Sequence, residues 1–281
     1  MFSWGDARVQ RILIGFLTLA AGTAAYAQTP VVSSGGVVNA ASFAKGQAVT
    51  GGSLVSIFGT NLASSLATAD SIPLSTSLGN VSVTFNNVAA PLLFVNHDAT
   101  NGDQINAQLP WEVASSGGNV NVVVTRNGQA SQPVSVPVSA VSPGIFAVNF
   151  GVGNAIAYGN SDGIIAAAVG AIAGLTTHPA RINDPTTLVI LATGLGPVNP
   201  PVLTGNDVTD GKLHQCATTP QVLVGNVPAQ VVFAGMTPQF VGVYQINIII
   251  QPGTPTGDKV PIQISMGGIM TTNQVTIAVS N

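Results

Sequence analysis

The sequence predicts an all-β protein made of two tandem antiparallel β-sandwiches, and three observations support this prediction. The chain of 281 residues contains 32 Gly and 18 Pro, which end short strands and form turns. Only 6% of its residues are charged, against about 25% in an average soluble domain, which excludes coiled coils and long exposed helices. Segments of the first half also recur in the second half, and this repetition predicts two copies of one fold.

Alternating apolar and polar residues mark the strands. Residues 81–85 and 120–124 alternate as expected for strands with one buried face. Asn127-Gly128 supplies the two positive φ angles that a type I′ hairpin requires. Strands recur at about ten-residue spacing, the spacing expected of an immunoglobulin-like sandwich.

Four segments of the first half return in the same order 134 to 141 residues later. Residues 53–62 match 187–196, 87–94 match 226–233, 104–106 match 245–247, and 120–128 match 260–268. Two copies are too few for a solenoid, so we expect two tandem domains. The expected boundaries are 28–141 for the first sandwich, 142–185 for a connector and 186–281 for the second sandwich.

The first 27 residues have the order of a secretory signal peptide. Arg8 and Arg11 precede the apolar run 12–21, and Ala25-Tyr26-Ala27 gives a cleavage site. The apolar run is shorter than the roughly 20 residues that span a bilayer, although an uncleaved anchor is the alternative. We therefore expect residues 1–27 to be removed, export to the cell envelope or the medium, and no transmembrane segment afterwards.

The connector is expected to form a β-hairpin. Residues 154–158 and 164–168 flank the turn sequence 160–163. The run Ile164 to Leu175 is apolar on every face but too short to span a membrane. It is interpreted either as a buried strand with a following loop or as an apolar docking surface.

Titratable residues are scarce, so we expect no enzyme and assign no catalytic residue. His97, His178 and His214 all lie in polar, loop-like stretches, and no recognised catalytic motif occurs in the mature chain. One alternative is a hydrolase whose serine site is assembled from distant loops. Another is a nucleophilic Cys216 with His214, which would share one face of a strand.

Two places could bind a ligand. Asp98, Asn101 and Asp103 provide three oxygen-bearing side chains within six residues, which suits a hard cation such as calcium, although surface turns have the same composition. Trp111 is the candidate for stacking on a sugar ring, and the alternative is that it caps a core or packs between the domains. Nucleic acid is excluded as a partner, because a net charge of −3 provides no basic surface for phosphates.

Several blocks of the mature chain are similar to known families. They are 36–43, 51–62, 104–106, 109–112, 143–146, 192–198 and 240–247. Block 51–62 resembles the opening of IPT/TIG domains, which are immunoglobulin-like modules. The set from about residue 35 to residue 279 resembles the Solibacter-type C-terminal domain family of exported bacterial proteins, whose function is uncharacterised. Two departures are the insert 97–103 and the Ala-rich run after Ile164.

The resemblance implies an extracellular or cell-envelope β-sandwich protein and supplies no catalytic residues. The expected architecture is therefore two tandem immunoglobulin-like (IPT/TIG-like) sandwiches joined by a β-hairpin connector. We expect a non-enzymatic module for adhesion, ligand binding or assembly, with a protein or glycan partner at the cell envelope. A carbohydrate-binding accessory protein is the alternative, followed by the hydrolase with a dispersed site.

Overall fold

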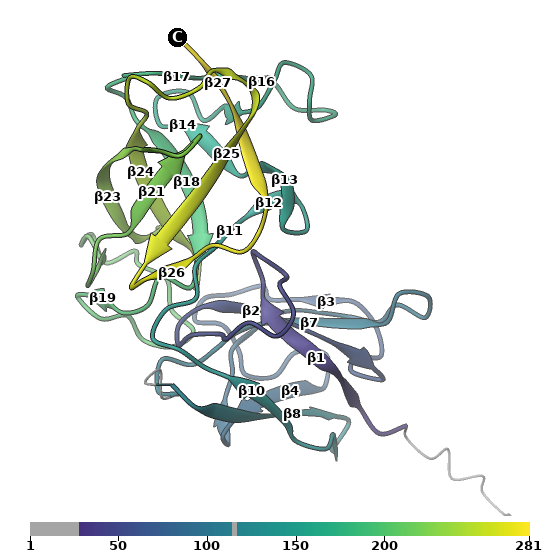
Figure 1. Cartoon of the computed structure of the whole chain (residues 1–281). Coiled ribbons are helices and arrows are strands. Elements are labelled where there is room, and N and C mark those ends of the chain that lie inside the picture. Colours follow the sequence, from purple (N-terminus) through teal and green to yellow (C-terminus); the bar gives the residue numbers. More distant parts are fainter. Residues whose placement is uncertain (1–27, 114–116) are drawn as a thin grey trace, which may run out of the picture.

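The computed structural model describes residues 28–113 and 117–281, where the chain forms 27 β-strands. Within these two ranges no helix is long and apolar enough to cross a membrane. The predicted signal peptide, residues 1–27, lies outside the described residues. Two β-sandwiches lie end to end, and the last strand runs to the far end of the second one (Figure 1).

The first sandwich consists of two five-stranded sheets, and their inward faces form one core. One sheet has the order β1-β2-β7-β6-β3, and the other has the order β10-β8-β4-β5 with β9 paired to β8. The strands of the first sheet are β1 (Val31–Asn39), β2 (Leu54–Thr60), β3 (Ala67–Thr68), β6 (Leu92–Asn96) and β7 (Asp103–Gln108). The strands of the second are β4 (Val81–Phe85), β5 (Val88–Ala89), β8 (Asn119–Arg126), β9 (Gln129–Ala130) and β10 (Val134–Pro137).

The predicted alternation is confirmed in both marked strands. In β4, Val81, Val83 and Phe85 are fully buried, whereas the two polar residues between them are half-buried. In β8 the valines at 120, 122 and 124 face the same core. Burying one face of each strand is therefore what holds the two sheets together.

The second sandwich has a nine-stranded and an eight-stranded sheet. The larger has the order β16-β15-β14-β18-β24-β23-β20-β19, with β11 paired to β18. Its strands are β11 (Gly144–Ile145), β14 (Ala157–Gly159), β15 (Ile165–Ala166), β16 (Thr177–His178), β18 (Leu188–Thr193), β19 (Val198–Asn199), β20 (Gln215–Cys216), β23 (Gln230–Met236) and β24 (Tyr244–Ile249).

The smaller sheet has the order β12-β13-β27-β25-β21-β22, with β17 paired to β27 and β26 to β25. Its strands are β12 (Ala147–Asn149), β13 (Val152–Ala155), β17 (Ala180–Arg181), β21 (Gln221–Val224), β22 (Val227–Pro228), β25 (Gly257–Met266), β26 (Ile269–Met270) and β27 (Val275–Ser280). Parallel pairs join β27 to β13 and to β17. The segment that follows the first sandwich therefore pairs with both ends of the last strand, and β25 pairs with its other edge.

The two sandwiches repeat one strand order, which confirms the predicted tandem fold. The order β2-β7-β6 in the first corresponds to β18-β24-β23 in the second, and β8-β4-β5 corresponds to β25-β21-β22. Four hairpins also have both central residues at positive φ: Asn86-Asn87, Asn127-Gly128, Gly225-Asn226 and Gly267-Gly268. These are the angles of type I′ turns, which match the twist of the flanking strands.

The expected hairpin between the copies forms in part and belongs to the second sandwich. Residues 154 and 155 lie in β13 of the smaller sheet, so only β14 forms the first strand of the hairpin. Tyr158 in β14 pairs with Ile165 in β15, and β14 also pairs with β18. The apolar run that follows divides in two, because Ala166 and Ala167 are buried, whereas 82% of Val169 is exposed. The boundaries 28–141, 142–185 and 186–281 stay predictions.

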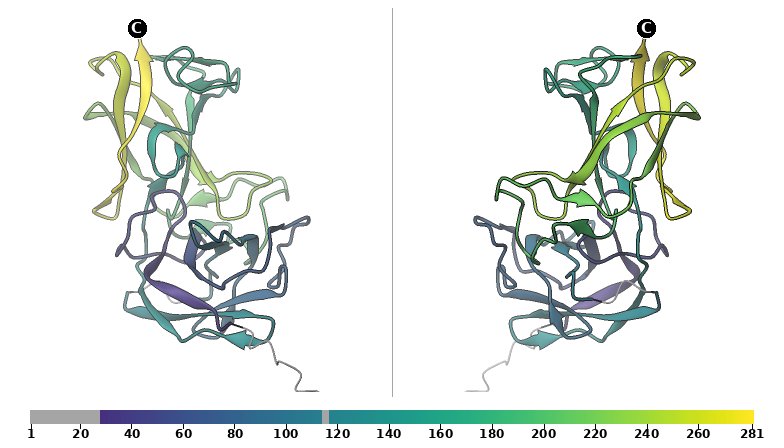
Figure 2. Two further views of the ribbon diagram at one scale, coloured as in Figure 1. Left: turned by 90° about the vertical axis from the view of Figure 1, so that its right-hand side faces the viewer. Right: turned by 90° about the vertical axis from the view of Figure 1, so that its left-hand side faces the viewer.

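The sandwiches meet at a joint, which we define as Asn39, Leu54, Ser142, Gly144, Thr193, Gly194 and Gly242. Asn39 Nδ2 donates a hydrogen bond to the Ser142 carbonyl oxygen at 2.8 Å. The Leu54 N–H donates to Thr193 Oγ1 at 3.0 Å. Both views in Figure 2 show the second sandwich seated on the first. The orientation is therefore fixed by directional bonds rather than by apolar contact alone.

Glycine is required where the joint is tightest. Gly194 has a φ of +83°, and a Cβ built on it would lie 2.0 Å from the carbonyl oxygen of Ser142. A Cβ on Gly144 would lie 2.5 Å from Asn39 Oδ1. A side chain at either position would therefore collide with an oxygen atom of Ser142 or Asn39.

Candidate functional site

The predicted calcium site lies in the loop between β6 and β7 and at the first residue of β7, and the carboxylate oxygens of Asp98 and Asp103 already have protein partners. Asp98 Oδ2 accepts a hydrogen bond from Asn101 Nδ2 at 2.9 Å, and Asp98 Oδ1 accepts one from the Thr100 N–H at 2.8 Å. Asp103 is 2% exposed, and its Oδ2 accepts a bond from the Leu62 N–H at 2.7 Å. In residues 28–113 and 117–281 no three acidic, His or Cys side chains gather where they could hold a metal ion. Calcium binding by Asp98, Asn101 and Asp103 stays a prediction.

Trp111 lies between the sandwiches. A Cβ added to Gly52 would be 2.2 Å from its ring, so the indole is in contact with the first sandwich, and it also packs against the second core. Its backbone N–H donates to Thr204 Oγ1 at 3.0 Å, and that hydroxyl donates to Glu112 Oε2. The indole therefore packs between the domains, and sugar stacking on it stays a prediction.

All three histidines of the chain pair with an aspartate. The pairs are His97 Nδ1 with Asp103 Oδ1 at 2.7 Å, His178 Nε2 with Asp162 Oδ2 at 2.8 Å, and His214 Nε2 with Asp210 Oδ1 at 3.0 Å. Among the described residues, no Ser, Thr or Cys side chain is hydrogen bonded to any of these rings. A serine triad needs such a contact between the nucleophile and its base.

Cys216 and His214 do not form a nucleophile and base. The ring nitrogens of His214 both face oxygen acceptors, the Pro200 carbonyl at 2.7 Å and the Asp210 carboxylate. No ring nitrogen is left to take a proton from the thiol. Burial also raises the pKa of the Cys216 thiol to about 12, so the reactive thiolate is disfavoured.

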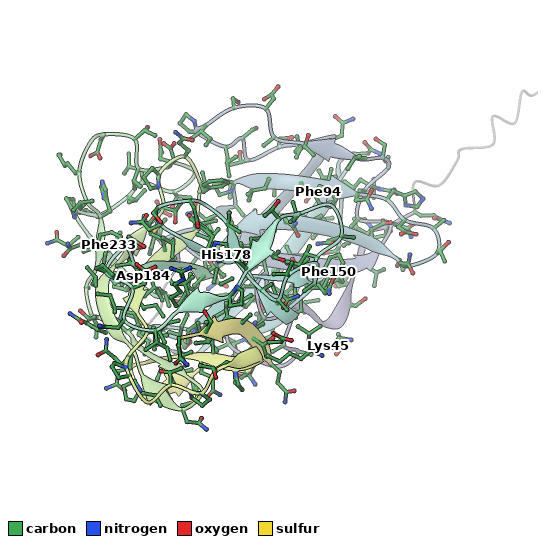
Figure 3. All side chains as sticks on the ribbon, turned by 90° about the horizontal axis from the view of Figure 1, so that it is seen from above. Lys45, Phe94, Phe150, His178, Asp184 and Phe233 are labelled. Carbon is green, nitrogen blue, oxygen red and sulfur yellow. The ribbon has the colours of Figure 1, made fainter. Side chains whose placement is uncertain are left out.

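A cavity of about 500 Å³ lies in the second sandwich. The strands β16 and β17, which contribute to its lining, are at the end away from the first sandwich (Figure 1). The whole lining comes from residues 159–166, 178–188 and 248–250 and from Ser280. Four ionisable side chains line it: Asp162, His178, Arg181 and Asp184. Figure 3 looks down on this end and labels His178 and Asp184. The whole chain has only three His and seven Lys and Arg, so this is a local concentration of charge.

Sequence reasoning missed this site because its parts belong to two different loops. Asp162 lies in the turn between β14 and β15, and His178 ends β16. The strands β15 and β16 pair in parallel, with Ala166 opposite His178, which brings the loops together. Nothing in the spacing of the residues indicates this pairing, because parallel strands are joined by connections of variable length.

The His178–Asp162 pair is an ion pair at the rim of the cavity. His178 Nδ1 lies 3.0 Å from the Pro179 carbonyl oxygen, and Nε2 lies 2.8 Å from Asp162 Oδ2. Both partners are acceptors, so the doubly protonated ring satisfies both. The Pro179 carbonyl and then Asp162 raise the pKa of His178, while the Ile164 N–H and then His178 lower the pKa of Asp162.

Arg181 is an exposed cation at the cavity, and it belongs to none of the four ion pairs found among the described residues. The backbone N–H and the hydroxyl of Thr186, and also the charge of Arg181, lower the pKa of Asp184. The positive charge of Arg181 therefore lies at the cavity, and its N–H groups form no ion pair with a carboxylate of the described residues. Such a guanidinium can donate hydrogen bonds to an oxyanion from solution.

Thr187 has an unusual backbone at the same cavity. Its φ is +66°, a region that β-branched residues rarely adopt. Its hydroxyl oxygen is buried and has no hydrogen-bond partner within residues 28–113 and 117–281. Strained residues and unpaired buried polar groups cluster at binding sites, because an absent ligand can complete them.

A second hollow of about 750 Å³ lies between the sandwiches, beside the joint, and its chemistry is different. It is lined mainly by apolar side chains, including Leu54, Phe146 and Phe240. Asp70 is the one ionisable residue in its lining. The hollow therefore lacks the convergent polar groups that give a small-molecule site its specificity.

Comparison with known proteins finds similarity to solved structures and to one domain family. Domains 5–6 of the S-layer protein SbsC match at 13% identity, covering 90% of this chain and 99% of that chain, with a TM-score of 0.23. The adhesin InvE of Yersinia pseudotuberculosis matches at 13% identity, with 88% and 60% covered and a TM-score of 0.20. The extracellular region of plexin A4 matches at 11% identity, with 90% of this chain but only 16% of plexin covered and a TM-score of 0.24.

No curated protein sequence matches the chain. The sequence of the first sandwich does match a family. Its residues 38–139 match the IPT/TIG domain.

Proposed function

We propose that the chain is an exported, non-enzymatic β-sandwich module that serves in adhesion, ligand binding or assembly at the cell envelope or outside the cell. The joint carries this proposal, because its hydrogen bonds hold the two sandwiches against each other, so that they can present surfaces at a set spacing. The IPT/TIG match of the first sandwich supports it. The resemblance of the sequence blocks to the Solibacter-type exported bacterial family supports it as well.

The chemistry of the titratable groups supports a role without catalysis. Each histidine is paired with an aspartate, and Cys216 is mostly buried with a raised pKa. General base catalysis needs a nitrogen or carboxylate within reach of the proton that it removes. Binding by neutral and polar contacts remains the chemistry that a surface with so few charges offers.

Export is tested with the full chain carrying a C-terminal tag in a bacterial host. We expect the tagged protein in the envelope or medium, with a mass that corresponds to cleavage after Ala27. Replacing Arg8 and Arg11 with Asp should retain it in the cytosol, because a signal peptide needs its positive N-terminal segment. Wild-type protein found only in the cytosol with residues 1–27 intact would contradict export.

Binding and catalysis are tested with the exported protein itself. Immobilised protein should retain envelope glycans or envelope proteins from the host, and it should leave chromogenic ester and glycoside substrates unchanged. Turnover that disappears in His97→Gln, whose ring has one nitrogen free of a protein partner, would show an enzyme instead. His214→Gln is the matched comparison, since both of its nitrogens are occupied.

A further inference from the structure

We propose that the cavity at the far end of the second sandwich binds a small sugar acid, meaning a monocarboxylate that also carries hydroxyl groups. Arg181 would hold the carboxylate, and the hydroxyl side chains of the cavity would bind the rest. This inference rests on the proposed function and names a ligand class for it. The proposed ligand site is therefore this cavity and not Trp111, and the sequence did not indicate the cavity.

Arg181 provides the anchor for a carboxylate. It lines the cavity and takes part in none of the ion pairs of the described residues. A guanidinium offers a planar fork of N–H donors that matches the two oxygens of a carboxylate. His178 adds a second positive charge, but both of its ring nitrogens already face protein acceptors.

The charge balance favours a monoanion over a phosphate. When His178 is protonated, His178 and Arg181 are opposed by Asp162 and Asp184 in the same lining, so the charges of the four groups sum to zero. A doubly charged phosphate would face the repulsion of two carboxylates, whereas a single carboxylate can bind Arg181 and keep its distance from them. The site therefore selects a ligand with one negative charge.

The remaining polar groups suit hydroxyl groups on the ligand. Ser161, Thr187 and Ser280 line the cavity, and the Thr187 hydroxyl is buried with no partner in the described parts of the chain. Asp184 uses its Oδ1 for the Thr186 N–H and hydroxyl, which leaves Oδ2 to accept from a ligand. A polyhydroxy ligand can supply both the donor and the acceptor that these groups need.

Size and apolar surface agree with a monosaccharide. The volume of about 500 Å³ lies within the range of small-molecule sites. Ile164 and Pro179 form a half-buried apolar part of the lining. That part can pack against the C–H face of a sugar ring while the polar rim binds its substituents.

The test is a calorimetric titration of the exported protein with D-glucuronate and D-galacturonate. D-glucose and D-galactose are the matched neutral sugars, and inorganic phosphate is the dianion. We expect saturable binding of at least one acid, with the neutral sugar at least about tenfold weaker, because a charge-assisted bond is lost. Arg181→Gln should weaken the acid by at least about tenfold, and Lys259→Gln should leave it unchanged, since Lys259 is exposed on β25 and outside the cavity.

A second measurement needs no variant. Binding of the acid should shift the NMR signals of the His178 ring, and the neutral sugar at equal concentration should not. The proposal is overturned if neither acid binds, if the neutral sugars or phosphate bind as tightly, or if Arg181→Gln binds like the wild type. Any of these results would leave the proposed export unaffected, because export does not involve Arg181.

Discussion

The Thr193 hydroxyl accepts a hydrogen bond from the Leu54 N–H at 3.0 Å, across the joint between the two sandwiches. The same hydroxyl donates to the Gly242 carbonyl oxygen at 2.7 Å. Thr193 is fully buried, so water cannot replace either bond. One side chain therefore satisfies two backbone groups that the fold would otherwise leave unpaired.

Thr193→Val should lower the free energy of unfolding by about 2 kcal/mol or more. Valine keeps the shape of threonine but leaves the Leu54 N–H and the Gly242 carbonyl buried without partners. Urea unfolding measures the change. Thr68→Val, on an exposed position of β3, is the control and should change stability by less than about 0.5 kcal/mol. Equal effects of the two substitutions would contradict this account of the joint.

Gly194→Ala should destabilise the chain far more than Gly174→Ala. Both glycines have a positive φ, +83° and +77°, so each alanine has a backbone cost of about 1 to 2 kcal/mol. Only at 194 would the new Cβ also meet backbone, the Ser142 carbonyl oxygen at 2.0 Å, whereas nothing lies within 4 Å at 174. Thermal unfolding compares the two variants. Similar melting temperatures would show that the joint is loose.

The His178–Asp162 pair should stabilise the fold mainly between about pH 4 and pH 6.5. The pKa of His178 is raised from 6.5, so its contribution is full below that value and is lost as the pH rises through the folded pKa. The pKa of Asp162 is lowered from 3.8, so its contribution is lost as the pH falls through the folded pKa. Because 44% and 38% of these side chains are exposed, solvent screening keeps the effect below about 1 kcal/mol.

The melting temperature of His178→Gln measured across this pH range checks that expectation. The difference from the wild type should shrink at alkaline pH. In an Asp162→Asn background the difference should be smaller, because the pair no longer exists, and the part that comes from the Pro179 carbonyl should remain. A difference that grows as the pH rises would have the wrong sign for this pair.

Cys216 should resist alkylation in the folded protein. Burial raises its thiol pKa to about 12, so almost no thiolate is present near neutral pH. Intact mass after treatment with iodoacetamide should show no adduct in buffer and one adduct per chain in concentrated guanidinium. Rapid labelling of the folded protein would indicate an accessible, activated thiol.

The repeated sandwich could be predicted from sequence because local patterns determine it. The alternation in 81–85 and 120–124 follows which face of each strand is buried, and Asn127-Gly128 carries its own turn geometry. That the hairpin 154–168 belongs to the second sandwich could be seen only in the structure. Its strand β14 pairs with β18, a partner that no local pattern specifies.

The cavity could not be predicted, because its groups are polar loop residues with no shared motif. Asp162 and His178 are 16 residues apart and meet only through the short parallel pair of β15 and β16. The sequence indicates the joint better than it indicates the cavity. Asn39, Gly144, Thr193 and Gly242 lie in the blocks on which the family resemblance rests, although their role appears only when the sandwiches are seen together.

The joint also has a consequence for avidity. Two domains on a soft linker lose orientational freedom when both bind one surface, and this lost entropy weakens the second contact. Here the bonds from Asn39 to Ser142 and from Leu54 to Thr193 restrict that freedom in the free molecule. A partner that contacts both sandwiches therefore meets contact surfaces at a pre-set spacing. A partner whose own contact surfaces have a different spacing cannot bind both sandwiches at once.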